Sequence, residues 1–95
     1  MNLNNLQANR EKILEIAAKH GAYNVRIFGS VARGEATEES DIDFLVDVGE
    51  HHSSWFPVGL KLDLEDFLQQ NVDIATQNSL HQLIRERVLR EAVLL

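Results

Sequence analysis

Two aspartates stand two residues apart in the middle of the chain, in the run Asp41-Ile42-Asp43. Residues two apart on an extended strand point to the same face, with their backbones roughly 6–7 Å from each other. Two carboxylates at that spacing repel each other unless cations neutralise them, and hard divalent ions bind through such oxygen ligands. Two bound ions can activate an attacking oxygen and stabilise the leaving oxygen in a displacement at phosphorus. The pair therefore predicts a two-metal site for phosphoryl transfer.

A third aspartate, Asp73, lies between Val72 and Ile74 in a short apolar run. A carboxylate within an apolar strand is costly to bury unless it is paired or bound to a metal. If this strand lies beside the strand of Asp41 and Asp43, Asp73 can reach the metal that Asp43 holds. We therefore expect Asp73 to complete a triad of metal ligands, and we take it as the best candidate for the general base on the incoming hydroxyl.

Gly29 and Ser30 follow an apolar run directly, at a place where a helix can begin. Glycine lets the backbone approach a phosphate that a side chain would block, and the N–H groups at a helix start favour anions. Arg33 follows one turn later and could clamp a phosphate oxygen. We expect these three residues to hold a triphosphate. The structural alternatives are a turn at Gly29, a helix cap at Ser30 and an ion pair between Arg33 and a nearby glutamate.

The acidic residues are concentrated in the middle of the chain. The 95 residues carry a formal net charge of −6, and residues 35–73 alone contain eleven acidic side chains and one basic side chain. Direct nucleic-acid binding is not expected, because a duplex-binding surface needs clustered Lys and Arg to replace counterions. Concentrated carboxylates attract divalent cations or a basic partner instead.

The chain has no cysteine, which excludes disulfides, thiolate nucleophiles and cysteine-based zinc sites. Its apolar runs are too short to span a bilayer, and the first ten residues have no apolar signal core. We therefore expect a cytoplasmic protein with no membrane contact. The adjacent residues His51 and His52 are poorly placed to converge on one zinc ion. Trp55 and Phe56 are expected to pack at a helix start rather than to stack on a base or a partner.

Hydrophobic periodicity indicates which elements position the candidate site. Strands are predicted over residues 24–28, 42–48 and 72–76, with a turn or short helix at 30–40 and a loop at 49–54. Helices are predicted over residues 5–19, from Pro57 to about residue 70, and after a cap at Ser79, with an apolar stripe of Leu80, Leu83, Ile84 and Val88 on the last helix. This order predicts an α/β (α+β) fold, in which a small mixed three-stranded sheet is flanked by helices in one domain spanning residues 1–95.

The motifs and their spacing are similar to those of the DNA polymerase beta nucleotidyltransferase superfamily. In this chain Gly29-Ser30 is followed after ten residues by Asp41-Ile42-Asp43, which resembles the Gly-Ser plus Asp-x-Asp signature of that superfamily. The runs at residues 29–34, 40–46, 72–74 and 85–93 resemble the minimal nucleotidyltransferases, which are the antitoxin partners of HEPN-domain ribonuclease toxins in prokaryotic two-gene modules. The resemblance covers essentially the whole chain.

The resemblance implies protein AMPylation, in which AMP passes from ATP to a tyrosine of the toxin with magnesium as the metal. By motif, it implies that Gly29 and Ser30 bind the nucleotide phosphates, that Asp41 and Asp43 hold metal, and that Asp73 is the third carboxylate. Two alternatives stay open at this point. The chain could neutralise a toxin by binding alone, with its acidic middle against a basic surface, or it could transfer a nucleotide to a small molecule or an RNA end.

Overall fold

The computed structural model describes residues 1–52 and 54–95, so Ser53 in the expected loop lies outside the described residues. The four strands are β1 (Ala22–Phe28), β2 (Ile42–Val48), β3 (Val72–Ala75) and β4 (Val93–Leu94). The helices are α1 (Leu3–Ala8), α2 (Arg10–Lys19), α3 (Gly29–Arg33), α4 (Val58–Leu68) and α5 (Gln82–Glu91), with a short 3-10 turn η1 (Gln77–Ser79).

The strands form one mixed sheet in the order β3-β2-β1-β4. Strand β1 is antiparallel to both β2 and β4, whereas β2 and β3 are parallel. The predicted α/β class and its mixed sheet are confirmed, but the sheet has four strands instead of three. The additional strand, β4, has two residues that pair with Arg26 and Ile27. Two residues are too few for an alternating pattern, so periodicity could not reveal this strand.

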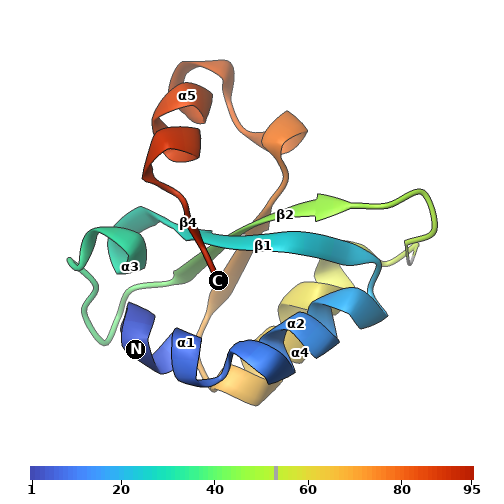
Figure 1. Cartoon of the computed structure of the whole chain (residues 1–95), viewed down its shortest axis with the longest axis horizontal. Coiled ribbons are helices and arrows are strands. Elements are labelled where there is room, and N and C mark those ends of the chain that lie inside the picture. The colour runs from blue at the N-terminus through green and yellow to red at the C-terminus, as the bar shows by residue number, and fades with distance from the viewer. Residues whose placement is uncertain (53) are drawn as a thin grey trace.

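One face of the sheet is covered by α1, α2 and α4, which lie together below the strands in Figure 1. The inward residues of β2, Ile42, Phe44 and Val46, are at most 1% exposed beneath these helices. The helix expected over residues 5–19 is interrupted at Asn9, which ends α1 and precedes α2. The break leaves the expected inward residues in place, because Leu6 and Ile13 are both fully buried.

Within the described residues, the opposite face is covered by α5 and η1, which lie above the strands in Figure 1. Its small core consists of Leu45, Leu80 and Val88. The predicted stripe on the last helix is therefore half wrong, because Leu83 is 86% exposed and Ile84 is 38% exposed. A single helix on a narrow sheet buries one row of side chains, so the neighbouring apolar row stays in solvent.

The predicted cap at Ser79 is also wrong. Ser79 closes the 3-10 turn instead, through a reciprocal capping box with Thr76. Helix α5 begins after His81, whose ring Nδ1 accepts a hydrogen bond from the N–H of Leu83 at 3.1 Å. Ser79 and His81 are both polar residues that could cap a helix. Because Ser79 belongs to the 3-10 turn, His81 is the residue that caps α5.

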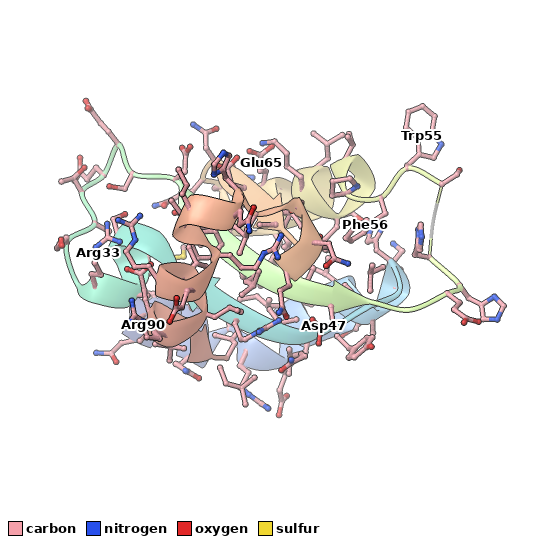
Figure 2. The ribbon with its side chains drawn as sticks, turned by 90° about the horizontal axis from the view of Figure 1, so that it is seen from above. Arg33, Asp47, Trp55, Phe56, Glu65 and Arg90 are labelled. Atoms are coloured by element: carbon pink, nitrogen blue, oxygen red, sulfur yellow. The ribbon has the colours of Figure 1, made fainter. Side chains whose placement is uncertain are left out.

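The aromatic pair after the loop divides between core and solvent. Phe56 packs against the large core, as expected, whereas Trp55 is 73% exposed. Figure 2 shows Trp55 at the edge of the molecule, at the opposite end from Arg33. Within the described residues, the helices are too short or too polar to cross a membrane.

Candidate active site

The pairing of the strands brings the predicted site residues to one end of the sheet. Asp43 on β2 is the register partner of Asp73 on β3 and of Phe28 on β1. Gly29 follows Phe28 directly and Asp41 immediately precedes β2, so both lie at this same end. Residues in register on neighbouring strands point to the same face, which here is the sparsely covered face that holds Leu45. The predicted proximity of Asp73 to Asp43 is confirmed.

The physical reason given for Asp73 needs correction. Strand β3 is an edge strand, and Asp73 is exposed instead of being buried in an apolar environment. Asp41 is exposed as well, whereas Asp43 is partly buried. The desolvation cost therefore falls on Asp43 and not on Asp73.

The carboxylate of Asp43 explains why residue 29 is a glycine. Gly29 has φ +73°, and a Cβ atom added there would collide with Oδ2 of Asp43 and lie 3.1 Å from its Cγ. The backbone conformation and the space both favour glycine, because L side chains rarely adopt this φ. The Gly-Ser motif thus lets the loop after β1 approach the Asp43 side chain, a local role that does not depend on any bound phosphate.

Electrostatics at this end of the sheet favour a bound cation. Burial raises the pKa of the Asp43 carboxyl to about 6, and repulsion from Asp73 and Asp41 adds to the effect. A divalent cation would relieve this repulsion, and carboxylate oxygens are the ligands that Mg²⁺ prefers. The three side chains do not form a preformed cage, since no three acidic, His or Cys side chains among residues 1–52 and 54–95 already converge on a metal position. The fit to Mg²⁺ rests on the register of the strands and on the pKa of Asp43.

Ser30 is the second residue of α3, which begins one residue earlier than expected. The alternative role of Ser30 as the helix cap is not observed: the N-cap residue is Phe28, and within the described residues no side-chain hydrogen bond caps α3. The carbonyl of Ser30 accepts hydrogen bonds from Gly34 and Glu35 at the other end of this single turn. Ser30 and Arg33 therefore lie on one short helix that starts beside Asp43.

Arg33 is held by two glutamates. Its Nε donates to Oε1 of Glu35 at 3.1 Å, which confirms the expected local ion pair, and its Nη1 lies 2.6 Å from Oε1 of Glu91. The second oxygen of Glu91 accepts a hydrogen bond from the N–H of Gly29 at 3.3 Å. Sequence reasoning missed Glu91, because 58 residues separate it from Arg33 and no local pattern links the end of α5 to the start of α3.

The charges around Glu91 show that it is an ionised member of the site. Burial alone would raise the pKa of the Glu91 carboxyl, but the hydrogen bonds from Arg33 and from the N–H of Gly29 hold that pKa below its usual range. The same hydrogen bond, together with the bond to Glu35, raises the pKa of Arg33. In Figure 2, Arg33 lies on α3 with α5 beside it.

A lysine on α4 lies within electrostatic reach of the aspartates. Nζ of Lys61 lies 2.6 Å from Oε2 of Glu65, and this hydrogen bond raises the lysine pKa, with smaller contributions from Asp73 and Asp41. The same Glu65 oxygen accepts the N–H of Val72 at 2.9 Å, at the start of β3. Glu65 thus fixes both a cation near the site and the strand that carries Asp73.

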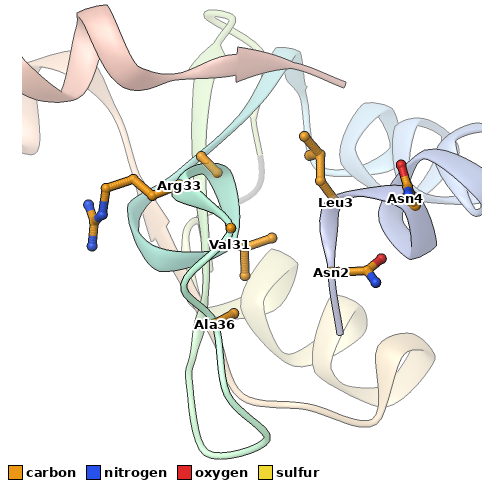
Figure 3. Close-up of a pocket in the computed structure, with 8 residues that line it drawn as sticks. Asn2, Leu3, Asn4, Val31, Arg33 and Ala36 are labelled. Atoms are coloured by element: carbon orange, nitrogen blue, oxygen red, sulfur yellow. The ribbon is translucent and has the colours of Figure 1, made fainter.

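A hollow of about 340 Å³ lies beside α3, between it and the N-terminal residues. Figure 3 shows Asn2, Leu3 and Val31 around this hollow, while the guanidinium of Arg33 points away from it. Arg33 belongs to the lining of this hollow, but none of the described aspartates does. The hollow is therefore separate from Asp41, Asp43 and Asp73.

The chain matches the family described as "Nucleotidyltransferase domain" over residues 10–95. It is 47% identical over 93 residues to "Putative protein adenylyltransferase MJ0435" of Methanocaldococcus jannaschii, an alignment that covers 98% of this chain and 97% of that protein. It is 40% identical over 79 residues to "Protein adenylyltransferase MntA" of Thermococcus cleftensis, with 83% and 80% coverage.

Solved structures give the same comparison at the level of the fold. One, named "Structure of putative minimal nucleotidyltransferase", has a TM-score of 0.85 and 49% identity, and the match covers 100% of this chain and 97% of that one. Another, named "Crystal structure of the toxin-antitoxin with AMP-PNP", has a TM-score of 0.75 and 22% identity, covering 90% of this chain and 71% of that one. At 22% identity the second likeness concerns the fold alone.

Proposed function

The chain belongs to the nucleotidyltransferase domain family, and on this premise we propose that it transfers AMP from ATP to a tyrosine hydroxyl of a partner toxin, in a Mg²⁺-dependent reaction. The observation that carries the proposal is the position of Asp43, which lies in register with Asp73 and against Gly29. It supports the proposal because two carboxylates and the turn that starts at Gly29 lie together at one end of the sheet.

The carboxylates of Asp41, Asp43 and Asp73 would hold Mg²⁺, with two ions expected. Bound Mg²⁺ would supply neutralisation of the phosphate charge and a more acidic acceptor hydroxyl. The phosphates of ATP would accept hydrogen bonds from the backbone N–H of Gly29, the hydroxyl of Ser30 and the guanidinium of Arg33. These groups lie together on α3, so they would orient the triphosphate as one set.

The transfer itself is a substitution at the α-phosphorus of ATP. The tyrosine oxygen forms a bond to that phosphorus while the bond to the pyrophosphate oxygen breaks, and the hydroxyl proton passes to a carboxylate. Asp73 is the best-placed acceptor of the proton, because it is exposed at the edge of the sheet, where a partner protein has access. Pyrophosphate leaves toward Ser30 and Arg33.

The proposed partner is a HEPN-domain toxin, and the chain acts as its antitoxin. Two relatives support a protein acceptor, because the proteins from Methanocaldococcus jannaschii and Thermococcus cleftensis are named as a putative protein adenylyltransferase and a protein adenylyltransferase. The proposed reaction is carried out by residues 1–95 as a single domain, in the cytoplasm, where ATP and the toxin meet.

The direct test is incubation of the chain with the toxin encoded beside it, ATP labelled at the α-phosphate, and MgCl2. We expect the label on the toxin with the native chain and none after Asp41→Ala with Asp43→Ala. The matched control is Glu38→Ala with Glu39→Ala, which removes the same charge from exposed positions in the preceding loop. Absence of label with the native chain, or equal label with the aspartate double variant, would refute the proposed reaction.

The same variants separate catalysis from neutralisation by contact. Cells that express the toxin should be rescued by the native chain and by the Glu38→Ala, Glu39→Ala control. Rescue by the aspartate double variant as well would show that binding is sufficient and that the antitoxin role does not require transfer.

A further inference from the structure

The Glu91 carboxylate lies on two of the donors assigned above to the phosphates of ATP. One of its oxygens is 2.6 Å from Nη1 of Arg33, and the other accepts the N–H of Gly29 at 3.3 Å. The Glu91 side chain is only 14% exposed, so this position lies largely out of solvent. A carboxylate and a phosphate are both anionic acceptors, and they make the same kind of hydrogen bonds to these donors.

The two anions cannot occupy this position together. Gly29 has a single backbone N–H, and a phosphate placed on it would lie against the negative charge of Glu91. The surroundings are already rich in negative charge, because Glu91 also contributes, with Asp73 and Asp41, to the raised pKa of Asp43. A triphosphate would add further negative charge at this point.

We propose that Glu91 is an internal competitor of the nucleotide, whose carboxylate occupies part of the phosphate site in the free protein and leaves Gly29 and Arg33 when ATP binds. This inference rests on the proposed function, since it takes Gly29 and Arg33 as phosphate ligands. When a site must first be vacated, its apparent affinity for the ligand falls in proportion to the fraction of molecules in which the site is vacant. Glu91 therefore sets the apparent affinity for ATP.

Both Arg33 and Glu91 have another partner of opposite charge nearby when they separate. When Glu91 leaves, Arg33 remains anchored through its Nε to Glu35, while its Nη1 becomes available to a phosphate. The released carboxylate has a second cation in reach, because Arg87 stands one turn earlier on α5 and already attracts Glu91 electrostatically. Residues four apart on a helix are neighbours on its surface, so a change of side-chain rotamer is enough for the transfer.

A purely supportive role for Glu91 makes the opposite prediction. If Glu91 only holds Arg33 in position for the phosphate, its removal releases Arg33 and weakens ATP binding. If Glu91 competes with the phosphate, its removal strengthens ATP binding. The sign of the change in affinity therefore decides between positioning and competition.

The experiment is a calorimetric titration of the whole chain with ATP in MgCl2. We expect Glu91→Gln and Glu91→Ala each to bind ATP about tenfold more tightly than the native chain, as removal of a competing charged hydrogen bond predicts. Glu91→Gln keeps the shape of the side chain, and Glu91→Ala removes the remaining amide acceptor. Circular dichroism of both variants checks that they are folded.

Two controls isolate the effect from net charge. Glu86→Gln removes one negative charge from an exposed position on the same helix and should leave the affinity unchanged. Glu35→Gln removes the other carboxylate from Arg33 but leaves Glu91 in place, so it should change the affinity much less than Glu91→Gln.

Unchanged or weaker ATP binding by both Glu91 variants overturns the competition, as does an equal gain from Glu86→Gln. Failure of the proposed function has a different signature. If the Glu91 variants bind ATP more tightly while no chain transfers AMP to the toxin, competition stands and the transfer reaction is refuted. If neither the native chain nor the variants bind ATP, both are overturned.

Discussion

The two faces of the sheet divide the work of this small protein between them. The face covered by α1, α2 and α4 buries a large apolar core around Phe44, with Leu6 and Leu60 fully excluded from solvent. The face covered by α5 has a small core of Leu45, Leu80 and Val88, and it carries Asp43 and Asp73 at one end. We call the face under α1, α2 and α4 the helix-covered face and the face under α5 the open face. The larger apolar core indicates that the helix-covered face contributes most of the stability, whereas the open face buries less apolar surface and leaves charged groups accessible.

This difference predicts that substitutions on the two faces fail in different ways. On the helix-covered face, removing atoms leaves a cavity and lowers the free energy of unfolding. On the open face, removing a carboxylate is expected to abolish the proposed transfer reaction while relieving repulsion between like charges. Changes at Phe44 should therefore lower stability, and changes at Asp43 should lower activity, although the two are consecutive residues on the same strand.

The largest effect is expected for activity on the open face. Asp43→Asn should lower AMP transfer to the toxin by about 10⁴-fold, because a neutral amide is a poor Mg²⁺ ligand and loses several kcal/mol of charge stabilisation. The measurement is the initial rate of label transfer at saturating toxin. Asp66→Asn, at an exposed position of α4, is the matched control and should retain the native rate. A loss of less than tenfold in Asp43→Asn would remove Asp43 from the metal site.

The next effect is expected for stability on the helix-covered face. Phe44 is fully buried, and Phe44→Ala should lower the free energy of unfolding by about 3–5 kcal/mol. Urea titration followed by circular dichroism measures this change. Tyr23→Ala, at a 57% exposed position of β1, should change stability far less. Equal losses from the two aromatic residues would mean that the helix-covered face does not dominate the stability.

The contrast between the faces also explains what could be predicted from sequence. The alternation along β2 revealed Ile42, Phe44 and Val46, because a strand that packs under several helices needs an apolar residue at every second position. Asp43, on the other face of β2, was visible for the same reason, and Asp41 immediately precedes the strand. Local periodicity is strong where a face of the sheet is fully covered, and Asp43 lies on the strand that carries this pattern.

The residues that were missed depend on contacts between distant segments. Glu91 meets Gly29 only because β4 returns the chain to β1, and β4 has too few residues to leave a pattern. Leu83 was expected to be buried because it continues an apolar stripe, but helix periodicity does not tell how wide a surface the helix covers. The contact between distant segments and the width of the surface that a helix covers are tertiary properties, and local sequence patterns do not reveal them.

A smaller effect is expected from the titration of Asp43. Its folded pKa is raised to about 6 above a usual value of 3.8, so the folded state binds this proton more tightly than the unfolded state does. The stability linked to this group is fully present below about pH 4 and is lost as the pH rises to about 6. At about pH 7.5 without divalent cations, Asp43→Asn should be more stable than the native chain by about 1–2 kcal/mol, after allowance for partial exposure.

Urea titrations in EDTA at about pH 7.5 and about pH 4 measure this difference, which should shrink at the lower pH. Addition of MgCl2 at the higher pH should stabilise the native chain more than the variant, because the ion binds the folded carboxylates. A native chain that is more stable than Asp43→Asn in EDTA would show that the aspartates do not repel each other as their positions indicate.

The smallest effect is expected at the exposed apolar row of α5. Leu83 is 86% exposed, and Leu83→Ser should change the free energy of unfolding by less than about 0.5 kcal/mol. Val88, five residues later on the same helix and 2% exposed, provides the comparison, and Val88→Ala should cost about 1–2 kcal/mol because it removes buried methyl groups from the small core. Urea titration of the two variants at one protein concentration tests whether α5 buries a single row. A loss above about 1 kcal/mol from Leu83→Ser would show that this row is covered in solution, and the open face would then be less open than its exposed side chains indicate.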